Sequence, residues 1–432
     1  MPGPASHAHS PVPDRSDELF LTPPFHSPAS RRQLSIVALA VLLIAAAAMA
    51  FGGDGRIGDE WEHYQQVQWF AAGRYAVVDG LTTIPGLHAF VAAVQLALHV
   101  ESLGSARIVT MLFGALAAIA FASIRRALAP DESPGLATLQ FAFFPTLFPF
   151  CFLLYTDVPS LALVLSAFRC SLDRRHVLAG ALGVASLLVR QTNVGWIAFI
   201  ALLQVLELRA AAGTPRERVR AAAALWPYAA GVAAFAGYWL WHGSVSLSRS
   251  EAQVHPDFSF HSGNLFLMLF LVGAFFVPLL PAWLSRYAAA ARVRPALLAL
   301  PILLGVLYAT TFRVDHPYNL YEPDFYLRNA LLVYVAQHRW AFTAFGAVAV
   351  IAGCAVSQVR WQRPAFVLLL PVSALLVSAS WLIEQRYYLI PVALLLALRV
   401  RESRRAERVM LAWWMPVAVG LLYLILNRSF FL

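Results

Sequence analysis

The sequence predicts an all-α polytopic membrane protein, and three observations lead to that prediction. Apolar residues occupy 60% of the 432 positions, whereas charged residues occupy 13%, about half their share in an ordinary soluble domain. The charged residues lie mostly in short segments between long apolar runs. A chain this apolar would aggregate in water, whereas a bilayer is an apolar solvent for helices that satisfy their own backbone hydrogen bonds.

About 13 apolar runs are long enough, or nearly so, to cross a membrane. They are 34–51, 106–124, 135–153, 156–172, 176–190, 192–208, 221–241, 263–284, 295–312, 338–356, 364–382, 385–399 and 408–426. A further run, 82–99, has Pro85 and Gly86 near its start, a pair typical of a helix entry rather than a helix interior. We expect this run to form a juxtamembrane or re-entrant helix in a first outer loop, 52–105.

Arginine predicts the orientation of these helices. All 32 basic residues are arginine, and the formal net charge is +9. Basic residues favour the cytoplasmic ends of membrane helices. Residues 1–33 are expected to be a disordered cytoplasmic tail, followed by a membrane domain, 34–432. If 82–99 does not cross the membrane, six arginine-rich loops lie on the cytoplasmic side. If it does cross, all six lie on the opposite side, which the arginine rule disfavours. We find no basic soluble domain of the kind that binds nucleic acid.

The three cysteines, Cys151, Cys170 and Cys354, lie in apolar runs without the spacing of metal ligands. We expect them to be buried free thiols.

Acidic residues gather at the start of the first outer loop, where Asp59, Glu60 and His63 stand close together. A carboxylate at the membrane surface can act as a general base on an acceptor hydroxyl, or hold a cation or a sugar. Acids are also favourable in the first turn of a helix, without any further role. The three side chains could bind a metal, but their spacing is weak evidence for it.

Two polar groups interrupt the apolar runs at predicted outer helix ends. Asp157 follows Tyr155 and Thr156, and an acid there needs a partner or caps the next helix. Arg190 stands with Gln191 and Asn193, on the side where arginine is otherwise rare. Its guanidinium could bind a phosphate through two hydrogen bonds, although any short turn also needs polar residues.

Later outer segments combine acids with histidine and aromatic residues. Glu251 and His255 lie in one, and Glu384 and Arg386 stand at the end of another apolar run. Such combinations occur in carbohydrate sites and also in the aromatic belts of membrane proteins. Glu384 and Arg386 could equally form a structural ion pair.

In collinear order, these motifs resemble the dolichyl-phosphate-glucose-dependent alpha-1,2-glucosyltransferase family, which adds the terminal glucose to the lipid-linked oligosaccharide. The matching stretches are Asp59-Glu60-x-x-His63, Thr82-Thr83-Ile84-Pro85-Gly86-Leu87, Phe144-Pro145-Thr146-Leu147, Tyr155-Thr156-Asp157, Arg190-Gln191-Thr192-Asn193, Glu251-Ala252 with His255, Glu384-Gln385-Arg386-Tyr387-Tyr388 with Pro391, and Asn427-Arg428-Ser429-Phe430. Asp157 stands where that family is expected to favour Glu, and segment 313–329 matches only loosely. The Ala-rich, lysine-free composition is typical of a high-GC bacterium.

The resemblance implies a GT-C superfamily fold with its active site in the first outer loop. It also implies a donor sugar carried on a polyprenyl phosphate. The sequence agrees, because it has no Gly-rich nucleotide-binding fingerprint. The expected acceptor is a lipid-linked or cell-surface glycan. The expected location is a bacterial inner membrane with the site facing outside, or the lumenal face of the endoplasmic reticulum in a eukaryote.

We therefore expect transfer of a hexose, with glucose the first candidate, and inversion at the anomeric carbon. Asp59 is the expected base, with Glu60 as the alternative, and Arg190 with Arg386 would stabilise the leaving phosphate. The expected substrate-binding residues are His63, Asp157, Arg190, Gln191, Asn193, Glu251, His255, Glu384 and Arg386. No cofactor is expected; a divalent cation is possible in principle but not indicated by any motif.

Two other classes remain open from the sequence alone. A transporter or lipid flippase also has many spans and buried charges, although its polar groups usually lie at the bilayer midplane on broken helices. A non-catalytic membrane scaffold would tolerate the loss of Asp59 and Glu60 together.

Overall fold

The computed structural model describes residues 28–51, 55–210, 214–248, 250–257, 259–320 and 325–432. This part of the chain is helical, and its β-pairing is limited to two isolated bridges, Tyr326–Phe431 and Trp361–Arg399. The predicted all-α class is therefore confirmed.

The chain divides into two units, residues 1–45 and 46–432. Helix α1 (Pro28–Phe51) runs through the boundary between them. It begins at Pro28, earlier than the predicted start of the first span at 34. The rest of the predicted disordered tail, residues 1–27, lies outside the described residues.

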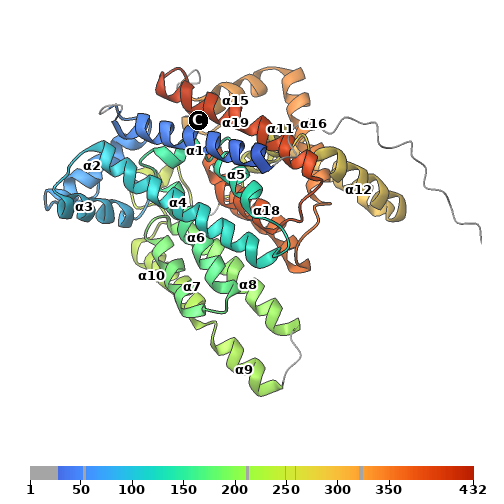
Figure 1. Cartoon of the computed structure of the whole chain (residues 1–432), viewed down its shortest axis with the longest axis horizontal. Helices are drawn as coiled ribbons and strands as arrows, with labels where there is room; N and C mark the ends of the chain where they lie inside the picture. The colour runs from blue at the N-terminus through green and yellow to red at the C-terminus, as the bar shows by residue number, and fades with distance from the viewer. Residues whose placement is uncertain (1–27, 52–54, 211–213, 249, 258, 321–324) are drawn as a thin grey trace, which may run out of the picture. The chain divides into compact units, whose positions relative to one another are not determined.

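Two helices of segment 52–105, the predicted first outer loop, pack against each other, α2 (Glu60–Ala71) and α3 (Gly86–Leu98) (Figure 1). The helix expected in 82–99 is confirmed, and it begins directly after Pro85 as predicted. Gly86 is required there by a close approach of two backbones. Its N–H donates to the Leu188 carbonyl at 2.9 Å, and a Cβ at Gly86 would lie 2.5 Å from the same oxygen.

The following helices form one packed group (Figure 1). Helix α4 (Leu103–Leu128) packs against α6 (Asp157–Leu172), α6 packs against α7 (His176–Leu187), and α7 packs against α10 (Trp226–His242). Helix α4 starts at a capping box, in which Ser102 and Ser105 each bond the backbone of the other. The nearby helices are α5 (Gly135–Ala142), α8 (Val194–Ala210) and α9 (Pro215–Ala223).

A second group is built around α16 (Arg339–Val356), which packs against α11 (Gly263–Phe275), α12 (Leu280–Val293), α13 (Ala299–Thr311) and α15 (Leu327–Gln337). The remaining helices are α14 (Pro317–Leu320), α17 (Leu369–Ser378), α18 (Leu389–Leu398) and α19 (Arg404–Leu426). Helix α18 is buried along its whole length because it contacts α4, α5, α6 and α17.

Four helical segments among the described residues are long and apolar enough to cross a membrane: Leu103–Leu128, Gln191–Ala210, Arg339–Val356 and Arg404–Leu426. Counting each of two bent helix pairs as one span raises the number to 6. The chain is thus an integral membrane protein, but the expected number of about 13 spans is not confirmed.

Proline divides two of the predicted runs, because it removes a backbone donor and interrupts a helix. In the run 135–153, α5 ends at Ala142 before Pro145, and a short 3-10 helix begins at Pro149. In the run 263–284, the chain bends by 114° between α11 and α12, a break that contains Pro278. Hydropathy alone reads each such run as one continuous helix.

Buried charged residues connect the C-terminal end of α4 to α18 and α19. Arg125 donates to the carbonyls of Ala397 and Arg399 at 3.0 and 2.7 Å. Arg399 binds both carboxylate oxygens of Glu407, at 2.6 and 2.7 Å. Gln140 donates to the same carboxylate at 2.8 Å, so the buried ion pair also has neutral hydrogen-bond partners.

The three cysteines are free thiols, as expected. Cys354 is buried, whereas Cys151 and Cys170 are only partly buried.

Candidate active site

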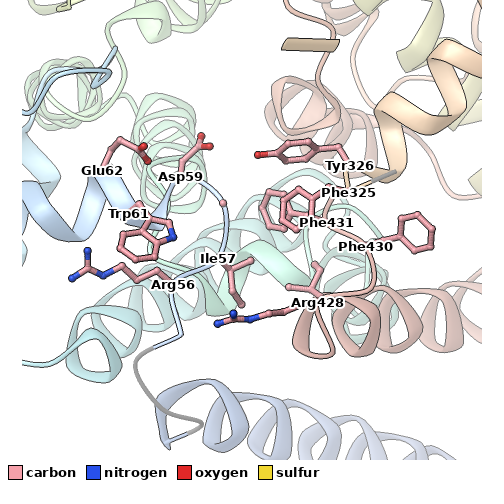
Figure 2. Close-up of a pocket in the computed structure, with 12 residues that line it drawn as sticks. Arg56, Ile57, Asp59, Trp61, Glu62, Phe325, Tyr326, Arg428, Phe430 and Phe431 are labelled. Atoms are coloured by element: carbon pink, nitrogen blue, oxygen red, sulfur yellow. The ribbon is translucent and has the colours of Figure 1, made fainter. Parts of the chain in front are cut away.

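Two cavities are lined by predicted site residues: cavity 1 lies beside the start of α2, and cavity 2 is lined by Arg190 and Arg386. Cavity 1, about 360 Å³, is bordered by acids, arginines and aromatic rings. Asp59 and Glu62 lie on one side of it, and the hydroxyl of Tyr326 points toward Asp59 from the other (Figure 2). Its full lining is Arg56, Ile57, Gly58, Asp59, Trp61, Glu62, Phe325, Tyr326, Ile425, Arg428, Phe430 and Phe431.

Cavity 2, about 410 Å³, combines a charged part with a larger apolar part. Its charged lining includes Asp157, Arg190 and Arg386. The apolar lining includes Val194, Trp196, Phe235, Leu376, Val377, Leu389 and Ile390. Polar groups from Thr82, Gln191, Asn193 and His255 also border it.

An ion pair joins the two cavities. Arg386, which lines cavity 2, binds the carboxylate of Asp59 in cavity 1 at 2.6 Å. Asp59 stands just before α2, but its side chain does not cap that helix. Asp59 therefore has a specific partner in addition to its place at the start of a helix. The Asp59 side chain is 40% exposed and Arg386 14%, so the carboxylate remains accessible from cavity 1.

Further ion pairs extend from this contact. Arg190 binds Asp157 at the start of α6. The Asp157 carboxylate also lies 4.0 Å from Arg386. Glu384 pairs with Arg386 at 2.6 Å, and the other Glu384 oxygen lies 3.2 Å from a third guanidinium, that of Arg328. The structure thus brings Asp59, Asp157, Arg190, Glu384 and Arg386 into one connected network, although they are far apart in sequence.

Glu60 points away from this network. It is fully buried, and Arg107 on α4 binds both of its oxygens, at 2.9 and 2.6 Å. It also accepts from the backbone N–H groups of Leu154 and Ile57, at 2.8 and 3.0 Å. With four donors bound to its carboxylate, Glu60 has the partners of a structural residue, and the geometry favours Asp59 over Glu60 as a base.

Tyr155 fixes the backbone on which Asp59 stands. Its hydroxyl accepts from the Asp59 N–H at 2.8 Å and donates to the Ile57 carbonyl at 3.3 Å. Its ring faces the Arg386 guanidinium at 5.4 Å. Gly58 lies directly beside this hydroxyl with a φ of +57°, and a Cβ there would be 2.4 Å from the oxygen. The local sequence Gly58-Asp59 therefore needs both the left-handed conformation and the absence of a side chain.

His63 lies behind Asp59. Its Nδ1 is 2.9 Å from Nε2 of His88 on α3, and both rings are buried. His63 also packs against the edge of Tyr155. Burial lowers the pKa of His63 to about 4, so the ring is neutral at pH 7.

Two other predicted residues brace the walls of cavity 2. Gln191 donates to the carbonyls of Thr82 and Val245 at 2.8 and 2.6 Å. Asn193 donates to Ser160 and to the Ser186 carbonyl. Both side chains are thus engaged with the protein itself.

The segment 250–257 contributes the last two predicted residues. His255 lines cavity 2, and burial, aided by the nearby His316, lowers its pKa to about 4. Glu251 lines neither cavity; its two oxygens accept from the hydroxyl of Tyr318 at 3.1 Å.

Charge around Asp59 sets its ionisation. Burial opposes the charged form, but the attraction of Arg386 is strong enough to hold the pKa of Asp59 below its ordinary value. Glu62 differs, because burial raises its pKa and the negative charge of Asp59 adds to the effect. Asp59 is therefore the more readily ionised of the two carboxylates in cavity 1.

The described part of the chain contains no group of three or more His, Cys, Asp or Glu side chains placed to hold a metal ion. Asp59, Glu60 and His63, which the sequence left open as metal ligands, point to three different partners.

Some residues of the site were not predicted. Arg328, Tyr326 and Phe431 come from the loosely matching segment 313–329 and the C-terminal stretch, which the Tyr326–Phe431 bridge brings together. The available signal was an arginine two residues after the aromatic pair Phe325-Tyr326. Arg107 was also missed, although an arginine inside the predicted membrane run 106–124 needs a partner.

Comparison with known proteins places this site in a family. The chain matches the DIE2/ALG10 family over residues 55–222 and 209–397. These ranges contain Asp59, Asp157, Arg190 and Arg386. The chain belongs to the DIE2/ALG10 family.

Curated relatives of this DIE2/ALG10 protein carry one name, Dol-P-Glc:Glc(2)Man(9)GlcNAc(2)-PP-Dol alpha-1,2-glucosyltransferase. The Drosophila melanogaster protein is 26% identical over 423 residues, covering 88% of this chain and 92% of the relative. The Emericella nidulans protein is 30% identical over 46% of this chain and 44% of its own length. A Homo sapiens protein is 32% identical over 33% of this chain and 34% of its own length.

Among solved structures, ArnT from Cupriavidus metallidurans aligns with 93% of this chain and 78% of its own, at 15% identity and a TM-score of 0.47. A likeness of this size does not by itself establish a common fold.

Proposed function

We propose that this DIE2/ALG10 family member is a membrane glycosyltransferase that moves a hexose, glucose by its relatives' name, from a polyprenyl-phosphate donor to a glycan acceptor. The acceptor is lipid-linked or part of a cell-surface glycan, and the site faces the outer side of the membrane. The observation that carries the proposal is the Asp59–Arg386 contact, because it places a candidate base and a candidate phosphate ligand between two cavities.

Cavity 2 has the composition that a polyprenyl-phosphate sugar needs. Two guanidiniums, those of Arg190 and Arg386, border its charged part, and arginine is well suited to phosphate through its planar pair of donors. The apolar part would receive the first isoprene units, since burying apolar surface is favourable by about 25 cal/mol per Å². A soluble nucleotide sugar would gain nothing from that apolar wall.

Cavity 1 suits the acceptor. Aromatic faces from Trp61, Tyr326 and Phe431 border it, together with the carboxylates of Asp59 and Glu62. Ligand sites commonly combine such apolar faces with a few polar groups that fix orientation. An acceptor hydroxyl that reaches Asp59 would lie beside the anomeric carbon of a donor held by Arg386.

The reaction follows from this placement. The Asp59 carboxylate takes the proton of the acceptor hydroxyl while the acceptor oxygen bonds to the anomeric carbon on the face opposite the phosphate. The bond from that carbon to the phosphate oxygen breaks, and its electron pair leaves with the polyprenyl phosphate. Arg190 and Arg386 stabilise the negative charge that develops there. Inversion of the anomeric centre follows from a single displacement.

Transfer from radiolabelled polyprenyl-phosphate glucose in proteoliposomes tests the proposal. Asp59→Asn keeps the side chain's shape but removes the base, and should lower kcat by about 10²–10⁴-fold. Thermal unfolding should change little, because the Tyr155 bond uses the Asp59 backbone. Glu62→Gln, in the same cavity, is the matched control. Near wild-type turnover by Asp59→Asn would exclude it as the base.

Arg190→Gln tests the donor site separately. We expect a higher KM for the donor and a lower kcat, because Arg190 would contact the phosphate both before and during bond cleavage. Label that crosses the bilayer without being transferred would instead identify a transporter or flippase.

A further inference from the structure

Arg386 is shared among three carboxylates, and this sharing has a consequence for catalysis. Its guanidinium lies 2.6 Å from Asp59, 2.6 Å from Glu384 and 4.0 Å from Asp157. Only Asp59 of the three lines cavity 1. The residue that would bind the donor phosphate is therefore the same one that neutralises the candidate base.

A carboxylate bonded to a guanidinium is a poor base, because the lone pairs that would accept a proton already accept hydrogen bonds and the nearby positive charge disfavours protonation. In this structure Arg386 binds one oxygen of Asp59, Oδ2, at 2.6 Å, and its positive charge holds the pKa of the whole carboxyl below its ordinary value. Asp59 becomes a stronger base when that contact lengthens.

We propose that Arg386 is a positioning residue that couples donor binding to activation of Asp59: the donor phosphate in cavity 2 draws the guanidinium away from Asp59 and leaves that carboxylate free to act. This inference rests on the proposed function. Phosphate competes well for arginine, since its oxygens accept two parallel N–H bonds. Binding of the donor then precedes productive use of the acceptor.

The surroundings of Arg386 allow this exchange of partners over a short movement. Glu384 keeps hold of the guanidinium from its other side, and the Tyr155 ring faces it. Tyr155 also fixes the backbone of Asp59, so the carboxylate stays in place when Arg386 moves. The Arg386 side chain already contacts Asp59 and already lines cavity 2, so it only has to rotate from one to the other.

Several other charges act on Asp59 and do not move with the donor. On the positive side this is Arg328, because His63 is neutral above its pKa of about 4. On the negative side they are Glu62, Asp157 and Glu251, and the hydroxyls of Tyr155 and Tyr326 are also near. When Arg386 leaves, burial and the neighbouring acids dominate, and both raise the pKa of Asp59. Donor binding should therefore be accompanied by proton uptake in mildly acidic solution.

Isothermal titration calorimetry with decaprenyl methyl phosphate measures that uptake. This probe is a phosphodiester like the donor, so it lacks the second ionisation of a phosphate monoester near pH 6. Titrations at about pH 5 in two buffers of different ionisation enthalpy should show net uptake of protons on binding. Asp59→Asn should bind the probe with that uptake lost. Arg74→Gln, which lines neither cavity, should keep it.

The two possible failures are distinguishable. Binding without a difference in proton uptake between wild type and Asp59→Asn overturns the coupling and leaves the proposed function intact. No binding of the probe to the wild type, in proteoliposomes that contain folded protein, overturns the donor site itself.

The pH dependence of turnover gives a second measurement. The profile of kcat/KM for the donor reports the free enzyme, and that of kcat reports the bound one. In the wild type, the acidic limb of kcat should lie at higher pH than that of kcat/KM. In Arg386→Gln the two limbs should coincide, whereas Arg74→Gln should behave as wild type. Coinciding limbs in the wild type, or an undiminished gap in Arg386→Gln, would overturn the proposal.

Discussion

The buried pair of Glu60 and Arg107 is expected to support the fold rather than the chemistry. Glu60→Gln leaves the Arg107 guanidinium buried without its counter-charge, and removing one partner of a buried pair costs about 3–5 kcal/mol. The cost belongs at the upper end, because the Glu60 side chain is fully buried and also binds two backbone N–H groups. Thermal unfolding in detergent is the assay. For a chain of this length, about 1–2 °C per kcal/mol and a cost of about 5 kcal/mol give a Tm lower by roughly 5–10 °C.

Glu62→Gln is the matched control. Glu62 lies two residues after Glu60 on the same helix, and it forms no ion pair among the described residues. Its Tm should stay near wild type. The double variant Glu60→Gln with Arg107→Gln should recover part of the lost stability, since no uncompensated charge remains. The reasoning is refuted if Glu60→Gln unfolds at the wild-type temperature while losing glycosyl transfer as completely as Asp59→Asn.

Three further outcomes are expected. Gly86→Ala should lower unfolding stability by about 1–3 kcal/mol, because a Cβ would lie 2.5 Å from the Leu188 carbonyl; Gly237→Ala, with open space around it, should show no such loss in a thermal melt. Tyr155→Phe should lower kcat about tenfold through loss of a hydrogen bond to the Asp59 backbone, worth about 1 kcal/mol or more; unchanged kcat would contradict this. Transfer should persist in EDTA, because the proposed mechanism neutralises phosphate with arginine; inhibition that magnesium reverses would contradict it.

The sequence predicted the residue types of the site better than the geometry of the membrane domain. Polar residues that interrupt apolar runs are costly unless they have partners, so Asp157, Arg190 and Arg386 could be picked out before their positions were known. The helix after Pro85 was predicted for a similarly local reason. The lengths of the spans were not, because prolines and a 114° bend divide runs that are uniform in hydropathy.

Pairings between distant segments could not be read from the sequence. Arg190 and Arg386 were both expected to bind phosphate. In the structure Arg190 forms an ion pair with Asp157, and Arg386 forms one with Asp59. Glu60 and Asp59 look alike as neighbours in the chain, yet the helical geometry of α2 sends one side chain toward Arg107 and leaves the other facing cavity 1. Which acid is structural depends on an arginine 47 residues away.

The ion pairs also limit how the chain can be threaded through the bilayer. Residues in contact share one depth, so the chain between Asp59 and Arg386 must cross an even number of times. Arg107, beside Glu60, and Arg125, beside Arg399, stand at opposite ends of α4, and 18 residues of helix separate their levels by about 27 Å. The return path from Arg386 to Arg399 has only 13 residues, about 20 Å if helical, so this segment has to run almost directly from the level of Asp59 to the level of Arg125.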